Sequence, residues 1–148
     1  GVREPALARA IDGTSQWLKR EMTAAQGFFY AAQDADNFVL STDAEPEEGR
    51  FYTWTYADLE QLLEVEELAA LSTHFYLNPQ GNFEDGLIVL QRRQGGELPA
   101  SVETALAKLF CIRYGQGPDL NLFPPARNNQ EAKTHAWSGR IPPVTDTK

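Results

Sequence analysis

Residues 27–36 read Gly-Phe-Phe-Tyr-Ala-Ala-Gln-Asp-Ala-Asp, and residues 48–55 read Glu-Gly-Arg-Phe-Tyr-Thr-Trp-Thr. Both runs are rich in aromatic residues, which favour extended chain. Alternate side chains of an extended chain share a face, so each run can offer aromatic rings on one side. Two such runs with a polar segment between them are typical of an antiparallel hairpin with a long connection, and the sequence predicts this hairpin.

The connection between the two runs is strongly acidic. Residues 34–49 contain no Lys or Arg and six acids, namely Asp34, Asp36, Asp43, Glu45, Glu47 and Glu48. Carboxylates beside aromatic rings are typical of sugar-binding sites, of metal sites and of ordinary solvated hairpins. All three interpretations stay open at this point.

Length and charge restrict the class of protein. The 148 residues suit a single domain, and the net charge of −8 comes from 21 acids against 13 Lys and Arg. This balance argues against a nucleic-acid or membrane partner, since DNA, RNA and anionic membranes all require a basic surface. No apolar run reaches the roughly 18 residues that a membrane span needs, and the first residues lack a signal-peptide core.

The chain contains one cysteine, Cys111, which cannot form a disulfide within the chain. Its neighbours Leu109, Phe110 and Ile112 are apolar, so we expect a buried structural thiol. A single cysteine suits a reducing compartment, and the sequence therefore predicts a cytoplasmic protein.

Helical spacing of apolar residues predicts helices on both sides of the hairpin. The first is expected over residues 4–22. Thr55 and Asp58 have the spacing of a capping box, which indicates that a kinked helix or two short helices occupy residues 56–76.

Later segments are shorter or less regular. The apolar run at residues 86–90 is expected to be a strand, and a further helix is expected to start at Pro99–Ser101 and to end at Gly115. Residues 118–148 are rich in proline, which excludes a long regular element there. The predicted fold is thus mainly α with a β-hairpin.

The order of these motifs resembles the spermatogenesis-associated, thioredoxin-domain-containing protein family. The resemblance covers roughly residues 4–114 and depends on the Asp-Ala-Asp run, on Phe-Tyr-Thr-Trp-Thr and on Gly-Asn-Phe-Glu at residues 81–84. It implies that the chain is a segment of an (α/α) toroid of the six-hairpin glycosidase or sugar-epimerase type.

The chain also departs from the family pattern. The family's thioredoxin-like domain, its cysteine pair and the second half of the toroid are absent from this sequence, and Asn37 replaces the family's serine after Asp-Ala-Asp. In residues 130–139 only Trp137 and Gly139 keep register with the family. We therefore expect a middle piece of a larger protein, or a short diverged relative.

Asp34 and Asp36 are the candidate catalytic residues. Two residues apart on a strand, they share a face, and paired carboxylates serve as acid and base in glycoside chemistry. They are also suited to bind a divalent cation through oxygen. The alternative is that both belong to a turn and accept hydrogen bonds from their own backbone.

Four further residues are candidates for substrate binding. Tyr52 and Trp54 are suited to stack on a sugar ring, or they pack in the core of the hairpin. Glu48 lies where the hairpin returns and is expected to face Asp34, or it is an ordinary loop acid. Asn82 follows Gly81 and contributes a side-chain amide either to the site or to a turn.

No cofactor or metal centre is expected. His74 and His135 are the only histidines, no metal-ligand spacing or Ser-His-Asp order is visible, and both residues are expected to have structural roles. The resemblance implies a carbohydrate-active or carbohydrate-binding segment, with a carbohydrate as its ligand. The alternative is a non-catalytic structural or interaction module, whose partner is the rest of the toroid or a second copy. Whether the chain is an enzyme stays open.

Overall fold

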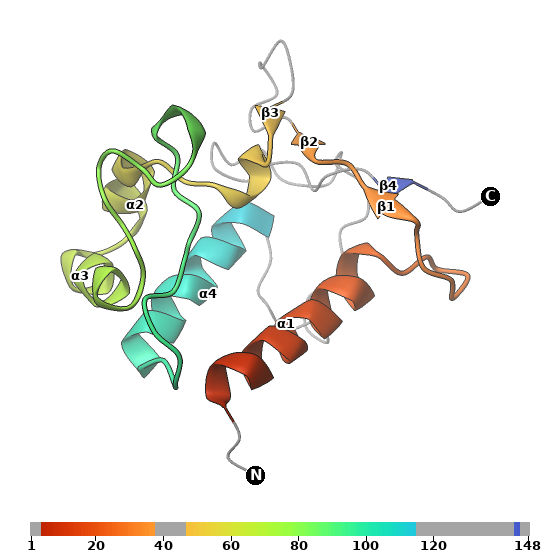
Figure 1. Ribbon diagram of the computed structural model, residues 1–148, viewed down its shortest axis with the longest axis horizontal. Helices are drawn as coiled ribbons and strands as arrows, with labels where there is room; N and C mark the ends of the chain where they lie inside the picture. Colours follow the sequence, from red (N-terminus) through yellow and green to blue (C-terminus); the bar gives the residue numbers. More distant parts are fainter. Residues whose placement is uncertain (1–3, 38–46, 115–143, 146–148) are drawn as a thin grey trace. The chain divides into compact units, whose positions relative to one another are not determined.

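The computed structural model describes residues 4–37, 47–114 and 144–145 (Figure 1). These residues form four α-helices: α1 (Pro5–Glu21), α2 (Tyr56–Leu62), α3 (Val65–His74) and α4 (Ala100–Tyr114). They also form two 3-10 turns, η1 (Arg50–Tyr52) and η2 (Glu84–Gly86), and four two-residue strands: β1 (Ala32–Gln33), β2 (Asp36–Asn37), β3 (Glu47–Glu48) and β4 (Val144–Thr145). The predicted mainly α fold class is confirmed. None of the described helices is long and apolar enough to cross a membrane.

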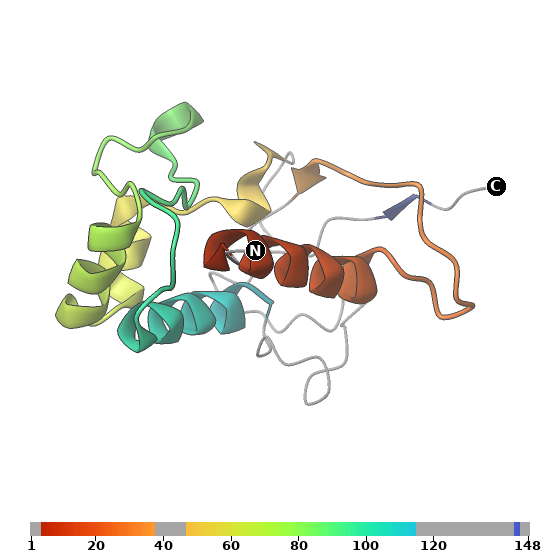
Figure 2. The same cartoon turned by 60° about the horizontal axis from the view of Figure 1, so that its bottom comes forward.

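The segment predicted as one kinked or two short helices consists of two, α2 and α3, which lie side by side (Figure 2). Thr55 begins α2 with the predicted capping box: its hydroxyl accepts from the Asp58 N–H at 3.0 Å, and the Asp58 carboxylate accepts from the Thr55 N–H at 3.1 Å. A second carboxylate starts α3, since Glu67 accepts from the Glu64 N–H at 2.9 Å. Each helix therefore has its own start signal, which explains the break between them.

The chain divides into two compact units. Unit 1 contains residues 1–6 and 52–109, and unit 2 contains residues 7–51 and 110–148. Each unit is described by itself below. The assignment of residues 1–148 to a single domain stays a prediction.

Unit 1 has an apolar core supplied by α2, α3, α4 and the loops between them. Its buried apolar residues are Trp54, Leu59, Leu63, Leu71, Phe75, Leu87, Ile88, Val102, Ala105 and Leu109. Trp54 and Ile88 exchange two backbone hydrogen bonds, of 3.0 and 2.7 Å, and so join the loop before α2 to the loop before α4. The run at residues 86–90, expected to be a strand, forms this single bridge and no longer ladder.

In unit 2 the predicted antiparallel hairpin forms only at the acidic ends of the two runs, with Asp36 opposite Glu48 and Asn37 opposite Glu47. The aromatic residues of the two runs lie outside this short ladder. The first run turns back at Gly27, whose φ is +92°, and pairs with the segment just after α1 through a Thr23–Phe29 bridge. Glycine adopts this backbone conformation without strain, and a short loop closes at lower entropic cost than the long acidic connection.

The end of the chain also contributes to unit 2. Within residues 118–148, the described pair Val144–Thr145 forms β4, which lies antiparallel to β1 with Gln33 opposite Val144. The remainder of the predicted proline-rich tail, including His135 and residues 130–139, lies outside the described residues.

Cys111 was expected to be buried, but it is exposed on α4. Leu109 and Tyr114 are buried on the same helix. Two positions along an α-helix correspond to a rotation of about 200°, so the residue two positions after Leu109 points away from the face that Leu109 buries. The apolar neighbours of Cys111 in sequence are therefore not its neighbours across the helix.

Candidate functional site

The three acids of the hairpin that the structure describes in full lie together in unit 2, and all three are exposed. The Asp34 carboxylate accepts from the Asp36 N–H at 3.0 Å, which is the turn arrangement considered as the alternative to a catalytic pair. Asp36 is the cross-strand partner of Glu48, so the expected pairing of Glu48 with Asp34 is shifted by two residues. We call Asp34, Asp36 and Glu48 the acidic rim.

The acidic rim brings one pair of carboxylates into register. Residues directly opposite in an antiparallel ladder have Cβ atoms about 4.5–5.5 Å apart, and like charges at such positions repel each other. A ligand with several hydroxyl groups could bind between these two carboxylates by donating hydrogen bonds to both of them. Within residues 4–37, 47–114 and 144–145, no group of three or more His, Cys, Asp or Glu side chains is placed to hold a metal ion.

The two predicted ring platforms have different environments, although they are two residues apart. Trp54 is 5% exposed and lies in the core of unit 1. Its ring is therefore packed in a core and is not available to stack on a sugar. Tyr52 ends η1 and is 47% exposed, which leaves its ring open to a ligand. Both belong to unit 1, whereas the acidic rim belongs to unit 2.

Asn82 organises a loop of unit 1. Its amide nitrogen donates to the Val89 carbonyl at 2.9 Å and to the Tyr76 carbonyl at 3.4 Å, while its amide oxygen accepts from the Val89 N–H at 2.8 Å. The loop is tightly folded here, since a Cβ added at Gly81 would lie 2.4 Å from the Gly86 carbonyl carbon. The Asn82 side chain is thus engaged by the backbone, as expected of a turn residue.

His74 forms the last turn of α3 and is half-buried. Its carbonyl accepts from the Arg93 N–H at 2.9 Å. This position agrees with the structural role expected for His74, while His135 lies outside the described residues.

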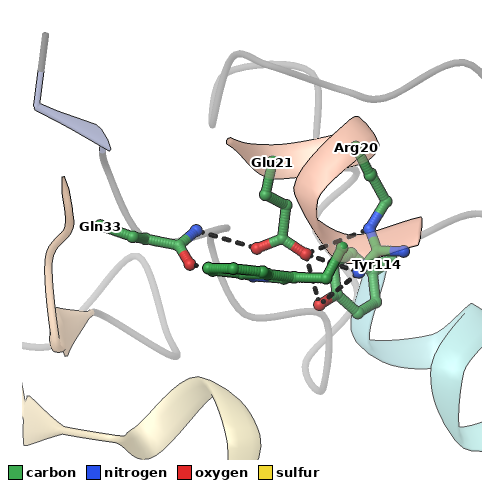
Figure 3. A network of polar contacts seen from close by, with 5 residues as sticks. Arg20, Glu21, Gln33 and Tyr114 are labelled. Carbon is green, nitrogen blue, oxygen red and sulfur yellow. Dashed lines mark hydrogen bonds and ion pairs between the residues drawn. The ribbon is translucent and has the colours of Figure 1, made fainter. Parts of the chain in front are cut away.

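The sequence did not point to a buried polar cluster at the end of α1, which we call the Glu21 network (Figure 3). The Glu21 side chain is 1% exposed. Its carboxylate accepts from Arg20 Nη2 at 2.7 Å, from the Tyr114 hydroxyl at 2.8 Å and from Gln33 Nε2 at 2.8 Å. The Trp17 indole N–H in turn donates to Gln33 Oε1 at 3.3 Å.

Aromatic rings surround the cation of the Glu21 network. The Arg20 guanidinium lies 4.5 Å from the Tyr114 ring centroid and 5.0 Å from that of Phe110, at distances typical of cation–π contacts. Phe110 and Tyr114 stack at 4.3 Å, and Phe51 meets Tyr114 edge to face at 5.0 Å. The pair of opposite charges is thus compensated by hydrogen bonds and rings, as burial of an ion pair requires.

Arg20 is buried, although arginine is mostly an exposed residue type. The available signal was the sequence Arg20-Glu21 at a helix end, directly before buried Met22. That signal is weak, since such pairs are common on exposed helices. Gln33 belongs to β1 and directly precedes Asp34 in sequence. Its hydrogen bond to Glu21 therefore holds β1 in place immediately before the acidic rim.

Comparisons with known proteins identify relatives of this chain. No known family profile matches it. The chain is 29% identical over 136 residues to "Spermatogenesis-associated protein 20" of Mus musculus, which covers 72% of this chain and 17% of the mouse protein. The proteins of the same name from Homo sapiens and Rattus norvegicus are 33% identical over 79 residues and 29% identical over 131 residues.

The match covers only a small part of each relative's length. It covers 47% of this chain and 10% of the human protein, and 68% of this chain and 16% of the rat protein. The chain thus spans less than a fifth of the length of each curated relative it matches. All three carry the name of the family that the Asp-Ala-Asp and Phe-Tyr-Thr-Trp-Thr motifs resemble, and the comparisons support a relationship of this chain to spermatogenesis-associated protein 20.

Proposed function

We propose that this chain is a structural and interaction segment of a longer protein of the family. The observation that carries the proposal is an apolar face on α1 that is open to solvent. Leu7 is 61% exposed and Ile11 is 58% exposed. Residues four positions apart lie on the same face of a helix, so these two side chains form one apolar stripe. Burying such a stripe against another helix gains about 1.5–3 kcal/mol for each large side chain.

The roles of the predicted site residues support this proposal. Trp54 is core, Asn82 fastens a loop, and the Asp34 carboxylate is used by its own turn. These side chains stabilise the local structure rather than converge on a substrate. The family resemblance also suggests what would cover the stripe. In an (α/α) toroid joined to a thioredoxin-like domain, the α1 stripe would pack against a neighbouring helix. The single cysteine is consistent with a cytoplasmic location for that protein.

Light scattering tests the proposal on the chain alone, where a second copy takes the place of the missing partner. We expect concentration-dependent self-association that weakens when Leu7→Lys and Ile11→Lys are combined. Val65→Lys is the matched control, because Val65 is 80% exposed on α3 and outside the stripe. A chain that stays monomeric at all concentrations, or a control variant with the same effect, would contradict the role of the α1 stripe.

The acidic rim supports a second candidate function, which is carbohydrate binding in the intact protein. The specific observation is the register of Asp36 opposite Glu48, which places two exposed carboxylates side by side. In a carbohydrate-active protein Asp34 and Asp36 would be the acid–base pair, with Glu48 as a ligand contact.

A thermal-shift screen against mono- and disaccharides tests this candidate, because a ligand that binds the folded state raises the melting temperature by mass action. We expect a shift that disappears in an Asp36→Asn, Glu48→Gln variant and persists in Glu60→Gln, an exposed acid of α2. A screen in which no sugar shifts the unmodified chain would leave the structural role as the function of this segment.

A further inference from the structure

The carboxylate of Glu4 binds a loop that is 92 positions away in sequence. Its Oε1 atom accepts from the Gly96 N–H at 2.9 Å and from the Ala6 N–H at 3.2 Å, all within unit 1. These backbone donors, with the Gly96 bond first, and the positive charge of Arg92 hold the pKa of Glu4 below its ordinary value of 4.5. The loop at residues 92–96 thus favours an anion at this position.

Arg92 has hydrogen-bonding capacity that the described part of the chain does not use. Its Nη2 donates to the Gly96 carbonyl at 2.8 Å, which fixes the guanidinium against the loop. Its Nε and Nη1 atoms are buried, and neither has a hydrogen-bond partner among the described residues. Buried donors without partners are uncommon, and each destabilises the fold relative to a satisfied donor.

The backbone of the loop leaves room for the carboxylate. Gly95 lies against Glu4, and an added Cβ there would be 2.8 Å from the Glu4 carboxylate oxygen. Gly96 has a φ of +93°, a conformation that glycine adopts without strain and that directs its N–H toward Glu4. Gly95 thus leaves the space that the carboxylate occupies, and Gly96 provides the backbone conformation that its N–H donor requires.

Another helix-starting carboxylate of unit 1, Glu67, shows the difference. Glu67 also accepts from a backbone N–H, but its Oε2 atom forms a direct ion pair with Lys108 Nζ at 3.0 Å. At Glu67 the nearby cation, Lys108, therefore already has a carboxylate partner. At the loop of residues 92–96 the carboxylate is exposed, and the guanidinium retains two nitrogen donors without partners.

We propose that residues 92–96 form a binding site for a carboxylate group, which Glu4 fills from within the same chain. A carboxylate carried by another molecule takes the same place when Glu4 is displaced, with the Gly96 N–H as its backbone donor and Arg92 as its countercharge. The ligand class is a small molecule or chain end with a free carboxylate. This proposal does not depend on the apolar stripe or on the acidic rim.

The test is a titration of the full chain carrying Glu4→Ala with sodium acetate at constant ionic strength, followed by the amide NMR signal of Gly96. We expect a saturable shift in this variant. In the unmodified chain the apparent affinity should be about tenfold lower if Glu4 occupies the loop about nine-tenths of the time. Adding Arg92→Met to the variant should abolish saturation. Glu66→Ala, which removes one exposed acid from α3, should behave like the unmodified chain.

Three results would overturn the proposal: no saturable response in Glu4→Ala, an equal response in Glu66→Ala, or saturation by inorganic phosphate but not by acetate. If far-UV circular dichroism shows that Glu4→Ala does not fold, Glu4→Gln replaces it. The glutamine amide can still accept the Gly96 hydrogen bond but lacks the charge, so acetate should displace it more readily than it displaces Glu4. Absence of a saturable shift in Glu4→Gln would identify Glu4 as a structural fastening only.

Discussion

The two units are stabilised in different ways. The buried interior of unit 1 is almost entirely apolar, with Leu59, Leu71, Ile88 and Val102 fully enclosed. Unit 2 instead buries an ion pair, Arg20–Glu21, together with the aromatic ring of Tyr114. An apolar core gains stability from area removed from water and tolerates many side chains of similar volume. A buried ion pair gains little net stability, but it makes each of its members depend on the others.

The strongest test of the apolar side of this comparison is Trp54→Ala. Because Trp54 is 5% exposed, removing its ring should lower the free energy of unfolding by about 3–5 kcal/mol. Tyr52→Ala is the matched control, and an aromatic ring that is 47% exposed should cost less than about 1 kcal/mol. Chemical denaturation measures both. Equal losses would show that Trp54 is not a core residue.

The polar side is tested by Glu21→Met, which keeps the volume of the side chain but leaves the Arg20 charge unpaired. We expect a loss of about 3 kcal/mol, at the lower end of values for broken buried ion pairs, because Arg20 keeps its contacts with the Phe110 and Tyr114 rings. The double variant Arg20→Met, Glu21→Met should be more stable than Glu21→Met alone. If the second substitution makes the loss larger, the two charges are not a coupled buried pair.

A smaller effect is expected at the start of α2, where the structure depends on a local signal. Thr55→Ala removes the hydroxyl that accepts from the Asp58 N–H and should cost about 1 kcal/mol. Ser72→Ala is the control, since its hydroxyl donates to the Ala69 carbonyl within α3 and caps no helix start. Thermal unfolding followed by circular dichroism compares the two, and similar melting temperatures would contradict the capping role.

The smallest effect concerns pH and the start of α3. The Glu64 N–H and then the Lys108 ammonium lower the pKa of Glu67 from its ordinary value of 4.5. The stabilising contribution of ionised Glu67 is therefore fully present above about pH 4.5 and is lost as the pH falls through the lower, folded-state pKa. The stability difference between the unmodified chain and Glu67→Gln should shrink in this acid range. Glu66→Gln controls for net charge, and a difference that grows in acid would reverse the assigned sign.

Local signals made much of unit 1 predictable. The periodicity of apolar residues located the helices, and the spacing of Thr55 and Asp58 gave the start of α2. The core role of Trp54 and the turn role of Asn82 were both among the alternatives, because residue type alone limits what a buried indole or a turn amide can do.

Unit 2 was less predictable because its contacts join distant parts of the chain. The Glu21 network combines Trp17, Gln33 and Tyr114, and no spacing rule connects residue 21 to residue 114. The predicted hairpin was too long: the runs pair only at their acidic ends, while the start of the first run turns at Gly27 and pairs with Thr23. The Glu4–Gly96 contact could not be predicted either, because it joins residues 92 positions apart.

The exposed thiol of Cys111 sets a limit on the covalent chemistry of this chain. It is the one cysteine in the sequence, and it lies on a regular helix rather than in a loop. An alkylating reagent that is specific for thiols can therefore add one group to each chain, at one known position. Under oxidising conditions the same thiol can join two chains and never three, so disulfide formation has a natural end point at the covalent dimer.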